Sequence, residues 1–311
     1  MNLDPNEQNA LMKAVRLRTE ELRLNRLNKS TLSLPSTPST PSPSSPVEEE
    51  GEPIPQTQDV LELAKWVVNR RRNVKLRKHP CYDKLRLLVA LRKNAWLVGP
   101  AGSGKTTAAK QIADELNIPF AAPSIGRETT KSEIFGFMHA HGGVVRTMFR
   151  ECWENGGLIL LDEFDYASAA VGTSLNTATS SPFAGFPDST IERHPDFALI
   201  ATANTYGTGA TSQYIGSNAL NAATLNRFVF LKWPYDEAME RAISMNKDWA
   251  QHVQRHRKAA SDLNINFVIS PRATIDGADL LAVGFTVKDV EEMVLFKGLD
   301  EATVEKIKAN A

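Results

Sequence analysis

The chain has 311 residues, a length that accommodates one large or two ordinary domains with a sizeable core. Its 36 Lys and Arg residues balance 36 Asp and Glu residues, which excludes a global field that attracts nucleic acid or a membrane surface. Cys81 and Cys152 lie far apart without a CxxC spacing, so we expect neither a disulfide framework nor a zinc site, and a reducing compartment is indicated. No apolar run approaches the roughly 18 residues of a membrane span, and the N-terminus is not basic and then apolar, so we expect a soluble, cytoplasmic protein without a membrane segment.

The first 57 residues contain two segments of different composition. The start at Asp4–Glu7 is typical of a capped helix and predicts a helix within residues 1–29, which is either a solvated helix or a docking helix. Residues 30–57 are rich in Ser, Thr and Pro and then acidic, with almost nothing to bury. We expect a disordered linker there, followed by a folded body.

The folded body opens with a helical pattern over residues 59–68 and continues with a strongly basic stretch over residues 70–93. The stretch holds ten Lys and Arg residues against one acid, Asp83. A nucleic-acid surface that contacts phosphates has this composition, and so do the exposed faces of two helices whose apolar side carries Leu85 and Leu88. Both interpretations stay open at this point.

A strand, a glycine-rich loop and a helix follow in the order that phosphate binding requires. Ala95–Val98 is a short apolar run that predicts a buried strand, Gly99–Thr106 matches G-x-x-x-x-G-K-T, and residues 107–116 predict a helix. Three glycines let the loop backbone curl with its N–H groups inward, and the helix adds the positive end of its dipole. Lys105 supplies a mobile charge for the β- and γ-phosphates, and the Thr106 hydroxyl is placed to coordinate Mg²⁺. The predicted nucleotide-binding residues of this loop are Gly99, Pro100, Ala101, Gly102, Ser103, Gly104, Lys105, Thr106 and Thr107.

The rest of the chain alternates helical segments with short apolar runs up to about residue 235. Such runs suit strands that are buried on both faces of a parallel sheet. They are residues 119–122, 158–161, 197–202 and 228–231. From Glu237 the sequence is helical, with Ser270-Pro271 as a cap and first turn before another helix. We therefore predict an α/β fold: a P-loop NTPase domain over residues 58–235, with a three-layer αβα core and a parallel sheet, followed by a small all-α domain over residues 236–311.

Polar side chains follow two of these apolar runs. Asp162 and Glu163 come directly after residues 158–161, at the carboxyl end where ligands bind in open α/β sheets. Asp162 suits the Mg²⁺ shell, and Glu163 is placed to orient and deprotonate an attacking water. Asn204, after the next run, either holds the water or the γ-phosphate or is a turn residue. The predicted cofactors are Mg²⁺ and ATP, which is preferred because residues 246–249 lack the N-K-x-D spacing of many GTPases.

These motifs stand in the order seen in AAA+ ATPases. The chain resembles that superfamily in the glycine-rich loop, in Leu158–Glu163, in Ala201–Thr205, and in the motifs at 225–228 and 270–272. Residues 193–209 are most similar to the MoxR-like branch, especially the cobaltochelatase ATPase subunit and phage-encoded relatives. The resemblance covers roughly residues 80–285, and it transfers fold and nucleotide chemistry rather than substrate.

The resemblance implies a homo-oligomeric ring, usually a hexamer, with ATP bound between neighbouring subunits. It implies that residues 236–311 form a helical lid domain. By position it implies that Asn204 is sensor 1, that Arg227 is an arginine finger acting on the next subunit's nucleotide, and that Arg272 is sensor 2 on the lid. Arg193 also lies in a segment that can face a neighbour, and an ordinary structural salt bridge stays open for Arg227 and Arg193.

The segment Ile134–Met138 stands where this family carries elements that face the central pore. Phe135 and Phe137 either grip a remodelled chain or simply pack beneath the loop, and both interpretations stay open. His139 and His141 follow, but no third ligand cluster accompanies them, so the sequence favours ordinary histidines over a metal site.

The sequence thus predicts an enzyme that hydrolyses ATP to ADP and phosphate and couples hydrolysis to remodelling of an unknown partner protein. Two alternatives stay open: an ATPase acting on nucleic acid, supported by residues 70–93, and a slow, ATP-gated binding module without motor activity. The metal-chelatase activity of the most similar relatives is not carried over, because it requires partner subunits that this sequence does not reveal.

Overall fold

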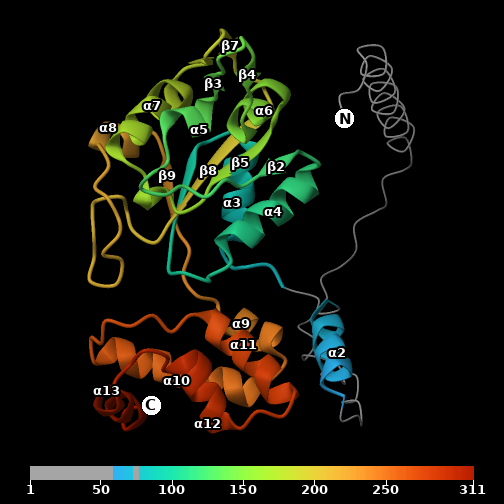
Figure 1. The fold of residues 1–311 in the computed structure, drawn as a ribbon, viewed down its shortest axis with the longest axis vertical. Helices are drawn as coiled ribbons and strands as arrows, with labels where there is room; N and C mark the ends of the chain where they lie inside the picture. The colour runs from blue at the N-terminus through green and yellow to red at the C-terminus, as the bar shows by residue number, and fades with distance from the viewer. Residues whose placement is uncertain (1–58, 73–76) are drawn as a thin grey trace, which may run out of the picture. The chain divides into compact units, whose positions relative to one another are not determined.

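The structure is a computed structural model that describes residues 59–72 and 77–311. The predicted N-terminal helix (1–29) and linker (30–57) lie outside the described residues, as do residues 73–76 of the basic stretch. A domain of strands and helices is followed by a region of helices alone (Figure 1). The first helix of the described chain, α2 (Val60–Arg72), contacts the C-terminal helices through Arg70 and Arg71. The helices of the strand-containing domain, in chain order, are α3 (Tyr82–Ala90), α4 (Lys105–Leu116), α5 (Lys131–Phe135), α6 (Met148–Asn155), the 3-10 turn η1 (Phe164–Tyr166), α7 (Ala169–Ser180) and α8 (Ala222–Leu225).

A five-stranded sheet, in which every neighbouring pair is parallel, organises this domain. Its strands are β1 (Ala95–Val98), β2 (Phe120–Ala121), β5 (Gly157–Leu161), β8 (Phe197–Ala203) and β9 (Val229–Lys232). All five predicted strands are confirmed, with ends that differ by at most one residue from the expected ones. The strand order is β2-β5-β8-β1-β9, so the residues that follow β1, β5 and β8 meet at one carboxyl edge.

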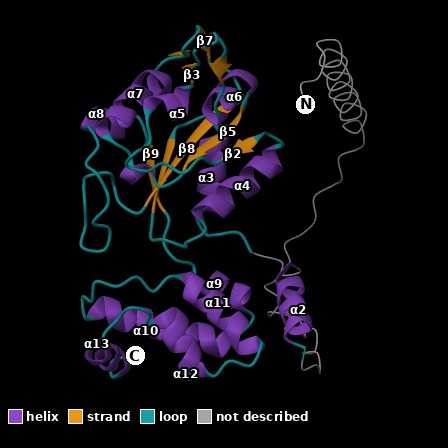
Figure 2. Ribbon diagram, in the orientation of Figure 1, coloured by secondary structure: helices purple, strands orange, loops and turns teal. Residues whose placement is uncertain are grey.

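Both faces of the sheet are buried, which explains why its strands are continuous apolar runs. Leu158 and Leu160 of β5 lie in an apolar cluster with side chains of α3 and α4. Ile159 and Leu161 point the other way, since side chains alternate along a strand, and lie in a second cluster with α6 and α7. Helices therefore cover both faces (Figure 2), and the predicted three-layer αβα core is confirmed.

Two small antiparallel hairpins lie outside the central sheet and were not predicted from the sequence. They pair β3 (Phe137–Met138) with β4 (Val144–Val145), and β6 (Phe183–Gly185) with β7 (Thr190–Glu192). The two aromatic residues whose roles the sequence left open lie in different elements, Phe135 at the end of α5 and Phe137 in β3. Phe135 is buried against Phe149, whereas Phe137 is 47% exposed, so the packing interpretation holds for Phe135 alone.

The two histidines between β3 and β4 form no metal cluster. The His139 and His141 rings lie near each other, with centroids 6.2 Å apart, and the His141 N–H donates to His139 Nδ1. Within residues 59–72 and 77–311, no third His, Cys, Asp or Glu joins them at metal-binding distance. The expectation of ordinary histidines at these two positions stays a prediction.

Every described element after β9 is a helix. These elements are α9 (Glu237–Ser244), α10 (Lys247–Asp262), α11 (Pro271–Ala282), α12 (Val287–Val290), the π-helical turn η2 (Glu291–Leu295) and α13 (Glu301–Lys308). Their apolar side chains form a third cluster, separate from the two that cover the sheet. α11 begins as predicted, with the Ser270 hydroxyl accepting from the Arg272 N–H at 3.3 Å. The all-α character of this region is confirmed, whereas its boundary at residue 236 stays a prediction. None of the described helices is long and apolar enough to cross a membrane.

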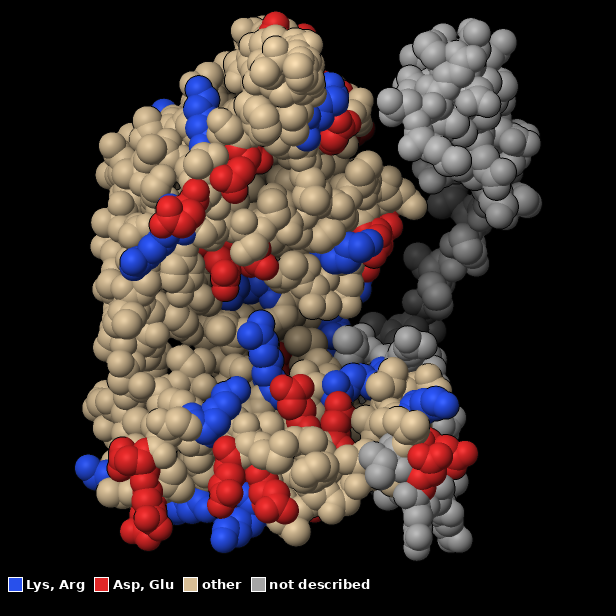
Figure 3. All heavy atoms as spheres, in the orientation of Figure 1, with Lys and Arg blue, Asp and Glu red and all other residues tan. Residues whose placement is uncertain are grey.

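In the described part of the basic stretch at 70–93, five Lys and Arg side chains form ion pairs with carboxylates. The Arg77 guanidinium lies 2.7 Å from Asp236, and the Lys78 ammonium lies 2.6 Å from Glu115. On the face shown in Figure 3, Lys and Arg side chains mix with Asp and Glu. This pairing favours exposed helix faces over a nucleic-acid surface. Further ion pairs of the stretch are Arg71–Asp279, Arg86–Asp83 and Arg92–Asp196.

Candidate nucleotide-binding site

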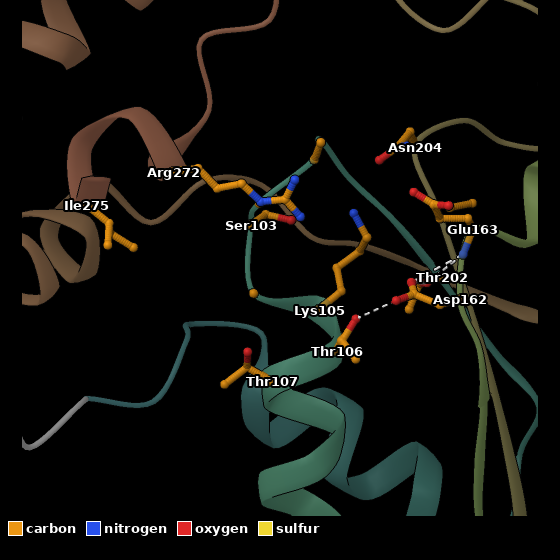
Figure 4. Close-up of a pocket in the computed structure, with 14 residues that line it drawn as sticks. Ser103, Lys105, Thr106, Thr107, Asp162, Glu163, Thr202, Asn204, Arg272 and Ile275 are labelled. Carbon is orange, nitrogen blue, oxygen red and sulfur yellow. Dashed lines mark hydrogen bonds between the residues drawn. The ribbon is translucent and has the colours of Figure 1, made fainter. Parts of the chain in front are cut away.

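A cleft of about 320 Å³ lies at the carboxyl edge of the sheet, where β1, β5 and β8 end. It brings together most of the site residues predicted from the sequence (Figure 4). Gly99, Pro100 and Arg227 are not among the residues that line it. The lining residues are Ala101, Gly102, Ser103, Gly104, Lys105, Thr106, Thr107, Asp162, Glu163, Thr202, Ala203, Asn204, Arg272 and Ile275.

The glycines of the loop are required for two different reasons. Gly102 and Gly104 have φ values of +76° and +82°, in the left-handed region that favours glycine. Gly99 instead lies against the backbone of Trp233, where an added Cβ would come within 2.0 Å of the carbonyl oxygen. The Trp233 indole N–H also donates to the Ser103 carbonyl at 3.0 Å. The loop is therefore held by close contact on one side and open to the cleft on the other.

Lys105 is the first residue of α4, and its ammonium group is buried within the loop. The ammonium donates to the carbonyl oxygens of Gly99 at 2.7 Å and Pro100 at 3.0 Å. Burial lowers the pKa of Lys105 to about 8, although the nearby carboxylates, led by Asp162, oppose this shift. A bound polyphosphate adds negative charge beside the ammonium and raises its pKa. The side chain is therefore suited to an anionic ligand that the protein itself does not provide.

Asp162 joins the loop to the neighbouring strands. Its Oδ2 accepts from the Thr106 hydroxyl at 3.1 Å, and its Oδ1 accepts from the Thr202 hydroxyl (Figure 4). The two residues predicted to hold Mg²⁺ are thus in direct contact. Carboxylate and hydroxyl oxygens are ligands that Mg²⁺ prefers, so this donor set fits the ion.

Glu163 has an unusual backbone for a residue with a side chain. Its φ of 58° and ψ of 36° place it in the left-handed region, and its N–H lies 3.2 Å from Asp162 Oδ1 and 3.3 Å from Thr202 Oγ1. Such conformations persist where the surrounding structure enforces them, often at functional sites. The turn directs the Glu163 carboxylate into the cleft, on the same side as Asn204 (Figure 4).

Asp165 was not predicted from the sequence, although its carboxylate binds the segment that carries Asn204. The residue is fully buried in η1, and its Oδ2 accepts from the backbone N–H groups of Asn204 at 3.2 Å and Thr205 at 3.1 Å. The same oxygen accepts from the hydroxyls of Thr205 at 3.0 Å and Ser217 at 2.9 Å. One carboxylate thereby fixes the segment that carries Asn204. Its partners lie 39 to 52 residues away in the chain, so no local pattern reveals the role.

The three arginines considered from the sequence occupy different environments. Arg272 is exposed at the start of α11 and reaches into the cleft (Figure 4). Arg227 lies outside the cleft and donates to the carbonyl oxygens of Asn176, at 3.2 Å, and Ala223. Arg193 lies over a tryptophan ring of α6. No carboxylate within the described residues forms an ion pair with Arg227 or Arg193.

Comparison with known families agrees with this arrangement. Residues 94–228 match the family model of the AAA domain, dynein-related subfamily. The matched range covers less than half of the chain and includes the glycine-rich loop, both acids after β5, Asn204 and Arg227. The fold is thus that of an AAA+ P-loop domain followed by an all-α region. The resemblance to the MoxR-like branch and to the cobaltochelatase subunit stays a prediction.

Similar proteins extend over most of the chain. An uncharacterized protein of Staphylococcus haemolyticus is 24% identical, over 73% of this chain and 92% of that protein. An uncharacterized protein of Staphylococcus epidermidis is 23% identical, over 71% and 90%. Among solved structures, NtrX of Brucella abortus in complex with ADP is 14% identical, over 79% of this chain and 60% of that chain, with a TM-score of 0.47. A candidate ATPase from Cytophaga hutchinsonii is 16% identical, over 81% and 96%, with a TM-score of 0.44. At these TM-scores neither structure supports an argument about function.

Proposed function

We propose that this chain is an AAA+ ATPase that hydrolyses ATP in a ring and couples hydrolysis to remodelling of a partner protein or complex. The main support is the convergence, in one cleft, of a phosphate loop, a buried lysine, a carboxylate with a hydroxyl, and a second carboxylate. Phosphoryl transfer to water requires these parts. The family match over residues 94–228 supports the same reaction class. We place the protein in the cytoplasm.

The residues of the cleft divide the proposed reaction among them. Lys105 exchanges its two carbonyl partners for oxygens of the β- and γ-phosphates. Thr106 and Asp162 would hold Mg²⁺, which when bound neutralises charge on the phosphates. Glu163 accepts the proton of the attacking water, and Asn204 orients that water beside the γ-phosphate. Arg272 would contact the phosphates from the side of α11.

A second hollow of about 220 Å³ adjoins the glycine-rich loop, and we assign the nucleobase to it. Its wall includes His79, whose Nδ1 accepts from the Cys81 N–H at 3.1 Å. The Nε2 of His79 therefore carries the proton and donates to the Pro234 carbonyl at 3.0 Å. Burial lowers the pKa of His79, which favours a neutral ring beside the base. The apolar wall, which suits the faces of a purine, consists of Ala108, Met239, Ile243, Pro271 and Ile275.

The position of Arg227 supports an active site shared between subunits. Its guanidinium lies outside the cleft of its own chain and binds backbone carbonyls, so its positive charge has no anionic partner among residues 59–72 and 77–311. A finger that acts in trans needs such a charge at the subunit surface. We propose a homo-oligomeric ring, with six subunits as the expected number, in which Arg227 faces the neighbour's γ-phosphate.

Affinity capture with Glu163→Gln in the presence of ATP tests the proposal. This variant keeps the phosphate loop and should hold the ATP-bound state together with its partner. Lys105→Ala is the matched control, because it removes the lysine that grips the triphosphate. We expect a protein that is retained by Glu163→Gln alone and that stimulates ATP turnover by the wild type when purified.

The stimulation assay also separates the alternatives. Turnover that rises with DNA, and loses this response steeply with salt, would replace protein remodelling with nucleic-acid action. Turnover that responds to neither protein nor DNA would indicate a slow, ATP-gated binding module. The ion pairs of residues 70–93 argue against the first of these outcomes.

A further inference from the structure

We propose that the C-terminal helices form a binding site for a divalent transition-metal ion, with Zn²⁺ as the expected ion and His252, His256 and Glu291 as its ligands. The ligand atoms of these three residues all lie within 4.8 Å of one another. Within the described parts of the chain, no other group of three His, Cys, Asp or Glu residues meets this condition. The site goes beyond the proposed ATPase, since it shares no residue with the nucleotide cleft.

The site is assembled from two separate elements. His252 and His256 are four residues apart on α10, so they share one face of the helix, and their ring centroids are 4.2 Å apart. Glu291 opens the π-helical turn η2, where the Phe296 N–H donates to the Glu291 carbonyl at 2.8 Å. Single π-turns occur often at functional sites. The His252 Nε2 already lies 2.7 Å from Glu291 Oε1, so the first two ligands are nearly in place.

The surrounding hydrogen bonds are those that orient metal ligands. His256 Nδ1 lies 2.7 Å from the His252 carbonyl oxygen, so this nitrogen donates and the Nε2 lone pair remains for an ion. Metal-binding histidines usually make such a bond with the second ring nitrogen. The Lys308 ammonium of α13 lies 2.5 Å from Glu291 Oε2, which orients the carboxylate and leaves Oε1 toward the histidines. His256 is only 5% exposed and Glu291 is also buried, so the ligands are largely shielded from solvent.

The donor set selects the class of ion. Two imidazole nitrogens with one carboxylate suit Zn²⁺ and neighbouring transition metals, whereas Mg²⁺ and Ca²⁺ prefer oxygen ligands alone. At Zn–N distances of about 2.0–2.1 Å, the ligand atoms of a tetrahedral site lie roughly 3.3 Å apart. Small side-chain rotations therefore close the cluster, with water in the fourth position. Binding requires the His252 proton to sit on Nδ1, because the ion takes the place of the hydrogen between His252 and Glu291.

Metal titration of the full-length protein, stripped with a chelator, tests this site. We expect one Zn²⁺ per chain, an increase in thermal unfolding temperature on adding Zn²⁺, and visible absorption typical of four-coordinate Co²⁺ when cobalt replaces zinc. His252→Ala and Glu291→Gln should each weaken Zn²⁺ binding by on the order of 10²-fold or more. The matched control is the double variant His139→Ala with His141→Ala, which removes two exposed histidines and should bind Zn²⁺ as the wild type does.

Two results would overturn the site. One is wild-type protein that binds no stoichiometric Zn²⁺, and the other is control protein that loses as much affinity as His252→Ala. The cluster would then be only a network of Glu291 with His252 and Lys308 that joins three helical elements. Glu291→Gln preserves the side-chain volume, and far-UV circular dichroism checks that each variant is folded. ATP turnover is not a readout, so failure here leaves the proposed ATPase untouched.

Discussion

The nucleotide cleft and the C-terminal helices pair their buried charges differently. In the cleft, the Lys105 ammonium binds backbone carbonyls, and the Asp162 carboxylate binds hydroxyl groups. In the C-terminal helices, the Glu240 carboxylate accepts from both terminal nitrogens of Arg257, at 2.8 Å and 2.5 Å. Neutral partners are displaced more easily than an opposite charge in a bidentate pair. The cleft is therefore suited to a charged ligand, whereas the Glu240–Arg257 pair holds α9 and α10 together.

If this comparison is correct, changes in the cleft impair catalysis more than stability, and changes in the helices do the reverse. The largest expected effect concerns Arg227, which lies outside the cleft of its own chain and which we propose completes the neighbour's cleft. Arg227→Ala should lower ATP turnover on the order of 10³-fold or more, because an arginine finger stabilises transition-state charge. Mixing it with Lys105→Ala should restore some turnover, since an Arg227→Ala subunit keeps its own loop and borrows the neighbour's finger. A co-assembled mixture as inactive as its components would place Arg227 in cis or in a purely structural role.

Glu163→Gln should lower ATP hydrolysis by about 10² to 10⁴-fold while ATP binding is retained, because the base is lost and the phosphate loop is not. Isothermal titration with ATP and a phosphate-release assay measure the two quantities. The unfolding free energy of Glu163→Gln should stay close to that of the wild type. Near-normal turnover would show that another group accepts the proton.

In the C-terminal helices, Glu240→Ala should destabilise the protein by about 3–5 kcal/mol, because it leaves the Arg257 charge partly buried and unpaired. Denaturant unfolding measures the loss. Glu151→Ala is the control: Glu151 pairs with Arg146 at the surface, where ion pairs contribute only about 0–1 kcal/mol. Equal losses in the two variants would contradict the contrast between the regions.

Asp165→Asn should lower kcat by roughly 10- to 100-fold with little change in KM, because Asn204 loses the carboxylate that fixes its backbone. The double variant Asp165→Asn with Asn204→Ala should lose little more kcat than either single variant, because both changes remove the same contribution of Asn204. If the role of Asp165 is purely structural, Asp165→Asn should lower stability, and the kcat losses of the two single variants should add up in the double variant.

The smallest effect is a pH dependence that arises from Lys105. Its folded pKa of about 8 lies below the ordinary lysine value of 10.5, so between these values the unfolded chain binds more protons and stability rises with pH. Relative to Lys105→Met, nucleotide-free protein should gain about 1 kcal/mol between pH 8 and pH 9. Below pH 8, the full free-energy penalty of burying the charged Lys105 ammonium lowers the stability of the folded protein. Saturating ATP should remove the gain, because bound phosphates keep Lys105 charged; a gain that persists with ATP would contradict the proposed contact.

The sequence predicted what depends on neighbours in the chain. β1, β5 and β8 were found because strands buried on both faces are continuous apolar runs, and Asp162 followed because parallel strands end at one edge. The hairpin strands β3 and β4 were missed because each has two residues and is largely exposed, so neither lies in a continuous apolar run like those of the buried strands.

Residues whose partners are distant in sequence were also missed. Asp165 binds groups 39 to 52 residues away, and Glu291 meets His252 across 39 residues. No spacing rule connects such positions, because the turns and helix crossings between them decide whether they meet. The roles of Asn204, Arg227 and Arg272 rest on the family resemblance and stay predictions until the variants are measured.

Trp233 stands directly behind the phosphate loop, and this placement makes it useful as an optical probe. Its indole donates to the Ser103 carbonyl at 3.0 Å, and its ring stacks on His79 with centroids 4.1 Å apart. The ring is fully buried, so its emission reports on the loop and on the wall of the adjoining hollow rather than on solvent. Nucleotide entry should change the electric field at this indole, so the share of Trp233 in the emission of the five tryptophans should change with occupancy of the site, without an attached dye.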